Sequence, residues 1–99
     1  MSHIVIWSLR SLECVQRLYN FFAAKDIEAA KTAAALILKQ AELLEQFPQV
    51  GRPAEDLEPE HRELRIPFGG AGYVLLYHYA ENGEAITVLA IRHQKEAGY

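Results

Sequence analysis

Hydrophobic residues dominate a short stretch at the start of the chain, HIVIWS at 3–8. The stretch is rich in β-branched and aromatic residues, which predicts a β-strand. Alternation along a strand places Ile4 and Ile6 on one face and Val5 and Trp7 on the other. Because both faces carry large apolar side chains, we expect this strand to lie beside other strands.

A helical spacing of apolar residues follows. Ser8 is a candidate N-cap, whose hydroxyl accepts from the first free backbone amides of a helix. Arg10, Glu13 and Arg17 lie opposite the apolar stripe of the predicted helix. Cys14 falls within the helical pattern, and we interpret it as a small buried hydrophobe. The stripe itself comprises Leu12, Val15, Leu18, Tyr19 and Phe22.

A second helix is predicted after a short break at 23–25, with Asp26 as its N-cap. The alanine run at 33–35 has high helix propensity and allows another helix to approach closely. Phe47-Pro48 ends this helix, because a residue before proline is driven out of the helical region. The short connection predicts an antiparallel helical hairpin. Its second apolar stripe comprises Ala30, Ala34, Ile37, Leu38, Ala41 and Leu44.

The second half of the chain has the pattern of strands. Residues 48–61 hold three prolines and one glycine, which predicts a loop. Asn82-Gly83 predicts a two-residue type I′ hairpin turn, and GGAG at 69–72 predicts another hairpin connection and not a phosphate loop, because no helix follows it. The predicted strands are 62–68, 73–80 and 86–93.

These elements define an α+β fold in one domain, residues 1–99, with the order β-α-α-β-β-β. The last three strands form an antiparallel meander, and the first strand pairs with its edge. We expect the helical hairpin to cover one face of this four-stranded sheet. The other face is then left as an open concave surface on which outward side chains meet a partner.

Arginines are the most informative polar residues of the predicted sheet. Arg62 shares the alternation of the inward residues Leu64 and Ile66, whereas Arg65 points outward. Arg92 shares the alternation of Ile86, Val88 and Ala90. Guanidinium groups on a concave sheet bind phosphate or carboxylate in bidentate fashion. The alternative is that Arg62 and Arg92 pair with acids of the rim, namely Glu55, Asp56, Glu58 and Glu60.

Charge argues against a nucleic-acid partner. The formal net charge is −3, with six basic and nine acidic residues in 1–60 and four of each in 61–99. Proteins that bind through phosphates normally carry a basic surplus. The single cysteine excludes an intrachain disulfide. Without an apolar run of about 18 residues or a secretion signal, we expect a soluble cytoplasmic protein.

Common catalytic and metal-binding motifs are missing from the sequence. The four histidines His3, His61, His78 and His93 form no HxH or HxxxH pair, so no metal or cofactor is predicted. The alternative is that two of them meet across neighbouring strands. No GxSxG motif is present, and Glu63 is the one strand carboxylate considered for a paired-acid site.

Several segments taken together resemble toxins of the RelE/ParE superfamily. They are the early WS, the LEQFPQVGRP segment, RELRIPF, YVLLYHY and the final IRHQKE, and their order covers the chain from Ile4 to about Lys95. RELRIPF and YVLLY look closer to ParE members than to RelE members. The resemblance implies the β-α-α-β-β-β fold and the toxin of a type II toxin–antitoxin system.

The resemblance implies one of two activities. ParE-like toxins inhibit DNA gyrase by protein binding and are neutralised by a ParD-like antitoxin encoded beside them. RelE-like toxins are metal-independent endoribonucleases that cut messenger RNA on the ribosome. The acidic balance favours gyrase inhibition without enzymatic activity or sequence-specific nucleic-acid binding. Tyr99 follows Ala97-Gly98, so nothing downstream holds it in place.

Each activity implies its own set of residues. A nuclease would use Arg62, Arg65, Arg92, His93 and Tyr99. Target-binding candidates are Arg52, Arg65, Arg92, His93 and Lys95, and antitoxin-binding candidates are Leu12, Tyr19, Phe21 and Phe22. Phe21 lies off the main apolar stripe, and the alternative is that it packs under the loop at 48–61.

Overall fold

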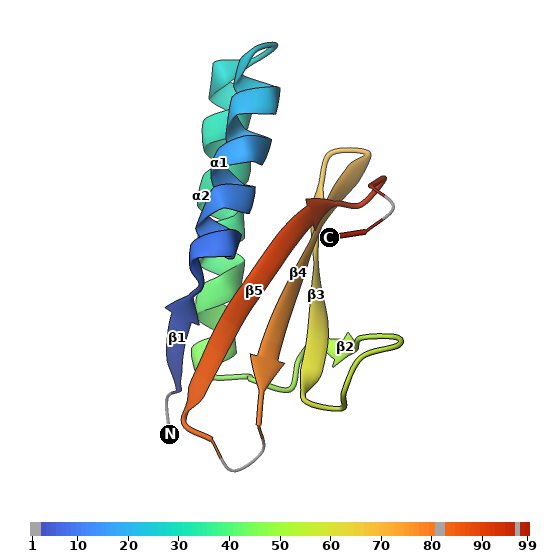
Figure 1. Ribbon diagram of the computed structural model, residues 1–99. Coiled ribbons are helices and arrows are strands. Elements are labelled where there is room, and N and C mark those ends of the chain that lie inside the picture. Colours follow the sequence, from blue (N-terminus) through green and yellow to red (C-terminus); the bar gives the residue numbers. More distant parts are fainter. Residues whose placement is uncertain (1–2, 81–82, 97) are drawn as a thin grey trace.

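A computed structural model describes residues 3–80, 83–96 and 98–99 (Figure 1). The helical hairpin lies against one face of a sheet, and its tip projects beyond the sheet. The elements are β1 (Ile4–Trp7), α1 (Leu9–Ala23), α2 (Ile27–Glu42), a 3-10 turn η1 (Leu43–Glu45), β2 (Arg52–Pro53), β3 (His61–Phe68), β4 (Ala71–Tyr79) and β5 (Ala85–His93). The α+β class and the order of the main elements are confirmed.

The sheet has five strands in the order β1-β5-β4-β3-β2. Strands β3, β4 and β5 form the predicted antiparallel meander, and β1 pairs in parallel with the edge strand β5. The fifth strand is the two-residue β2, within the segment predicted as a loop. Arg52 and Pro53 pair with Glu63 and Arg62 of β3.

Both helices begin at the predicted caps. The Ser8 hydroxyl accepts from the amide of Ser11, and the Asp26 carboxylate accepts from the amide of Ala29, each at 3.1 Å. These contacts satisfy backbone donors that the first turn leaves without a helical partner. The α1 stripe differs from the predicted one, because Ser11 is fully buried while Leu12 is 51% exposed. Ser11 tolerates burial because its hydroxyl donates to the carbonyl of Ser8.

The core lies between the inner faces of the hairpin and the sheet. Cys14 is only half-buried at its margin. Leu38, assigned to the α2 stripe, is 48% exposed, because the helices meet along the alanine side of α2. The most buried members of the core are Ala33, Ile37, Ala41, Leu44, Ile66, Leu75, Tyr77, Ile86, Val88 and Ile91.

The two hairpin connections differ from each other. Gly69 and Gly70 alone join β3 to β4, and Gly69 has a left-handed φ of 62° that favours glycine. The β4–β5 connection spans 80–84, and the Gly83 backbone is not in the left-handed region. The predicted two-residue type I′ turn is therefore wrong at Gly83, whose amide instead donates to the Ala80 carbonyl at 2.8 Å, so that Gly83 is the last residue of its turn. Asn82 lies outside the described residues.

One extra residue interrupts β5. Tyr77 pairs with Val88 and Leu76 pairs with Ala90, so Leu89 forms a β-bulge between them. Beyond it the alternation of β5 is reversed: Ile91 packs in the core, and Arg92 lies on the face away from the helices. The predicted grouping of Arg92 with Ile86 and Val88 is wrong for this reason.

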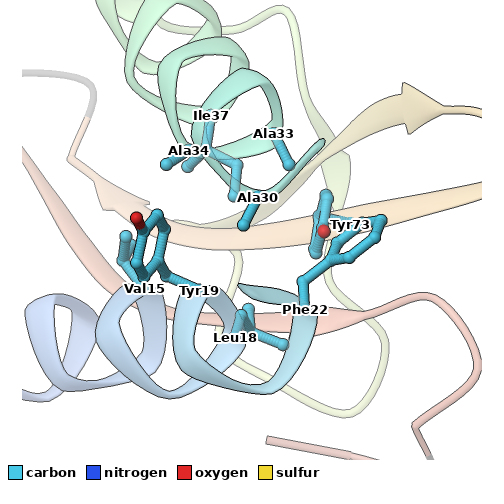
Figure 2. A pocket seen from close by; sticks show the side chains of 9 residues that line it. All are labelled: Val15, Leu18, Tyr19, Phe22, Ala30, Ala33, Ala34, Ile37 and Tyr73. Atoms are coloured by element: carbon cyan, nitrogen blue, oxygen red, sulfur yellow. The ribbon is translucent and has the colours of Figure 1, made fainter. Parts of the chain in front are cut away.

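A small cavity lies where the two helices meet above Tyr73 of β4 (Figure 2). Its volume is about 10 Å3, close to the space that one water molecule needs. Ala30, Ala33 and Ala34 of α2 face Val15 and Tyr19 of α1 across it. The lining is mostly apolar, and the alanines leave little room for larger side chains.

We therefore expect Ala33→Leu to lower the free energy of unfolding by about 1–3 kcal/mol, because the added carbons overpack this contact. Ala35→Leu, on the exposed side of the same helix, serves as the matched control and should stay within about 0.5 kcal/mol of wild type. Urea denaturation measures both. Equal stability of the two variants would mean that the helices separate easily at Ala33.

The Tyr77 hydroxyl fastens the segment after α2 to the sheet. It donates to the Pro48 carbonyl at 2.8 Å and accepts from the Gly51 amide at 2.9 Å. Gly51 is required here, because a Cβ at this position would lie 2.6 Å from the same hydroxyl. Burial is the main cause that raises the pKa of Tyr77, so the hydroxyl stays protonated and able to donate.

Tyr77→Phe should destabilise the protein by about 1–3 kcal/mol, because the buried Gly51 amide and Pro48 carbonyl lose their partner. The control is Tyr19→Phe, whose hydroxyl makes no hydrogen bond to any residue that the structure describes. Thermal or urea unfolding compares the two. A similar loss in both variants would rule out a special role for the Tyr77 hydroxyl.

Candidate functional site

Two arginines stand on the face of the sheet away from the helices. Arg65 of β3 and Arg92 of β5 both lie in register with Val74 of β4, between them. Glu63, two residues before Arg65, shares this face. We call the surface formed by Glu63, Arg65, Arg92 and Tyr99 the arginine face.

Arg92 holds the chain that follows β5. Its Nη1 atom donates to the carbonyls of His93, Gln94 and Glu96 at 3.3, 3.2 and 3.0 Å. One guanidinium thus satisfies three backbone acceptors, one at the end of β5 and two in the segment that follows it. Arg92 is consequently a structural anchor for the C-terminal tail, whose described residues are 94–96 and 98–99.

Tyr99 is held in place, contrary to the prediction from its terminal position. Its hydroxyl donates to Oε2 of Glu63 at 2.6 Å, and its ring lies over the Arg92 guanidinium, 5.2 Å from centroid to Cζ. Arg10 of α1 donates to the Tyr99 carbonyl. Burial, and then the bond to the Glu63 carboxylate, raise the pKa of Tyr99 above its ordinary range, so its hydroxyl is a donor and not a base.

The C-terminal tail partly covers the face of the sheet that was predicted to be open. Val74 and Leu76 are buried on the face away from the helices, and Tyr99 lies across it to reach Glu63. The sequence pattern of the strands could not show this, because the covering residues come from outside the sheet.

The alternative that Arg62 and Arg92 pair with acids of residues 55–60 is wrong. Arg62 donates to the Gly51 carbonyl at 2.6 Å on the helix side of the sheet, which agrees with its predicted inward alternation. Arg52 instead pairs with Glu63 at 3.3 Å. Both rim arginines therefore hold the segment 49–52 against β3.

His93 lies on the other side of the sheet from Arg92. Its ring packs edge-on against Tyr73 with centroids 5.7 Å apart, and its Nδ1 accepts from the Lys95 amide at 3.1 Å. The five nuclease candidates are thus divided. Arg65, Arg92 and Tyr99 share the arginine face, whereas Arg62 and His93 face the helices at opposite ends of the sheet.

The antitoxin-binding candidates on the helical hairpin are also separated from one another. Phe21 is 71% exposed near the tip of α1, so the alternative that it packs under the loop at 48–61 is wrong. Phe22 is half-buried and packs edge-on against Phe68 at 5.9 Å. Tyr19 lines the cavity between the helices, and Leu12 lies more than two turns before Phe21.

Sequence reasoning missed the role of Glu63 and undervalued the contact between His61 and His78. Glu63 is the carboxylate that joins Arg52 to Tyr99, and its shared alternation with Arg65 was the available signal. His61 and His78 do meet across β3 and β4, with ring centroids 5.2 Å apart. Within the described ranges no group of three His, Cys, Asp or Glu residues is placed to hold a metal ion.

The fold is that of toxins from toxin–antitoxin systems. It matches the solved structure titled "Chromosomal ParDE TA system from P. aeruginosa" with a TM-score of 0.79, covering 95% of this chain and 98% of that one at 21% identity. No helix in the described part of the chain is long and apolar enough to span a membrane.

Sequence comparison assigns the family. The family described as "ParE toxin of type II toxin-antitoxin system, parDE" matches residues 5–98. Toxin RelE1 of Caulobacter vibrioides is 30% identical over 96 residues, covering 97% of this chain and 98% of that protein. Toxin RelE3 of the same organism is 40% identical over 68 residues, 69% of this chain and 68% of that protein. The chain belongs to the ParE toxin family, within the RelE/ParE superfamily.

Glu96 connects the tail to α1. Its Oε1 accepts from the His93 amide at 2.8 Å and from Arg17 at 3.3 Å. The His93 amide is the largest cause that lowers the pKa of Glu96 below its ordinary value of 4.5, and Arg17 adds to it. Because the pKa is lower in the folded state, the ionised carboxylate stabilises the fold.

The stabilisation by the Glu96 carboxylate should be complete above pH 4.5, which is the ordinary pKa of a glutamate side chain. It should disappear as the pH falls through the lowered pKa of Glu96 in the folded protein. Glu96→Gln keeps the shape of the side chain but removes its charge. Urea denaturation of both proteins between neutral and acidic pH should show a gap in stability that closes at low pH. A gap that is independent of pH would show that the carboxylate charge plays no part.

Proposed function

We propose that this toxin acts in the cytoplasm by binding a protein target, DNA gyrase, and that a ParD-like antitoxin neutralises it. The match to the ParE family supports the target class. The similar P. aeruginosa structure is titled a ParDE toxin–antitoxin system, which supports an antitoxin partner. The exposed Arg65 and Phe21 leave separate surfaces for two partners.

The division of the nuclease candidates carries this proposal. Cleavage of RNA by its own 2′-hydroxyl requires a base, an acid and cations around one phosphate. On the arginine face, Arg92 is engaged by three carbonyls and the Tyr99 hydroxyl by Glu63. His93, the candidate base, lies across the sheet. Arg65 remains as an exposed cation suited to an acidic protein surface.

Purified toxin should inhibit supercoiling of relaxed plasmid by DNA gyrase and leave ribosome-bound messenger RNA intact. Arg65→Glu should weaken inhibition at least tenfold, because it places a negative charge on the proposed contact surface. Lys39→Glu, with the same change of charge on exposed α2, is the control and should inhibit like wild type. Supercoiling that is unaffected by the wild-type toxin would refute the gyrase assignment.

A RelE-like messenger RNA endoribonuclease is the second candidate. Two relatives in Caulobacter vibrioides are named RelE toxins, and His61 and His78 meet on the face that carries Arg65. In this case ribosome-bound message is cut while supercoiling continues. Arg65→Ala and His78→Ala should then abolish cutting, because they remove a cation and an imidazole from that face.

A further inference from the structure

A groove runs between the end of α1 and the adjoining ends of β4 and β5. Its volume is about 480 Å3, within the range of roughly 300–1,000 Å3 of small-molecule pockets. Four apolar or aromatic side chains form its floor and walls: Leu18, Phe21, Phe22 and Tyr73. Because α1 extends past the sheet (Figure 1), the groove is open along the helix tip.

Positive charge surrounds this groove although the chain as a whole carries −3. Arg17, Lys25 and Lys95 line it, together with His93. Glu96 is the one carboxylate in the lining, and it already accepts from Arg17 and from the His93 amide. The groove lining therefore has more positive than negative side chains and is electrostatically complementary to an acidic partner.

Phe21 is the most exposed aromatic side chain at the groove. A phenyl ring that is 71% exposed beside an apolar floor is an unfavourable arrangement for an isolated monomer. Lys25 lies over this ring, 5.6 Å from its centroid, so the cation and the apolar surface are presented together. Aromatic side chains in such pockets are typical centres of protein interfaces.

The ring geometry favours a peptide over a nucleic acid. Phe22 and Phe68 are inclined at 80°, and Tyr73 and His93 at 88°, so these rings pack edge to face with one another. Recognition of single-stranded RNA uses free ring faces on which bases stack. Lys25 lies over one face of the exposed Phe21 ring, and the groove between these rings offers an apolar space for an inserted aliphatic or aromatic side chain.

We infer that this groove binds an acidic segment of the antitoxin, with a large apolar side chain inserted beside Phe21 and carboxylates facing Lys25 and Lys95. The inference rests on the proposed antitoxin partner and adds where and by what chemistry it is held. Of the hairpin candidates it selects Phe21 and Phe22, and leaves out Leu12 and Tyr19.

The contribution of the groove lysines is tested by measuring how tightly the toxin binds the protein encoded by the adjacent open reading frame. Lys25→Glu and Lys95→Glu should each weaken its affinity at least tenfold by calorimetry, and raised salt should weaken wild-type binding. Lys39→Glu makes the same change outside the groove and should bind within twofold of wild type. All three lysines are exposed, so these variants should fold normally, which circular dichroism verifies.

A second pair of variants tests the apolar part. Phe21→Ala should weaken binding at least tenfold, whereas Leu38→Ala, on an exposed apolar residue of α2, should change it less than twofold. Both positions are exposed, so neither loss would reflect a collapsed core.

The outcomes separate the groove from the proposed function. If the adjacent protein binds but the groove variants bind like their controls, the groove assignment is overturned and the antitoxin partnership stands. If the adjacent protein does not bind the wild-type toxin, both are overturned. Binding of a single-stranded RNA oligonucleotide that the groove variants abolish would also overturn the inference.

Discussion

The bulge at Leu89 is the constraint on which the arrangement of functional residues depends. One extra residue in β5 reverses the alternation beyond it, so that Ile91 completes the core while Arg92 moves to the opposite face. Regular alternation from Ile86 would have put Arg92 into the core beneath the helices. A buried guanidinium without a charged partner would have been costly there. The bulge thus makes the core and an arginine in the same strand compatible.

The position of Arg92 in turn organises the C-terminal tail. By donating to three carbonyls, it gives an irregular segment the hydrogen bonds that a strand or helix would otherwise supply. Glu96 then reaches α1 through Arg17, and Tyr99 reaches Glu63 on β3. The tail therefore lies between the arginine face and the apolar groove, and contributes side chains to both.

The division of polar residues between the two faces bears directly on function. A toxin that cuts RNA needs its acid, base and cations at one place, whereas a toxin that binds proteins can use separate patches. Here Arg62 and Arg52 hold the segment before β3, Arg92 holds the tail, and Arg65 faces outward. Several residues that resemble a catalytic set are therefore occupied in maintaining the fold.

Local patterns in the sequence were sufficient for the helices, their Ser8 and Asp26 caps and the meander, because caps and periodic apolar faces depend on neighbours within a few residues. They also indicated the inward direction of Arg62. The bulge at Leu89, the anchoring of Tyr99 and the meeting of His61 with His78 were decided by tertiary structure. Each of these depends on which residues of distant segments pair, and one shifted residue changes the face of every side chain after it.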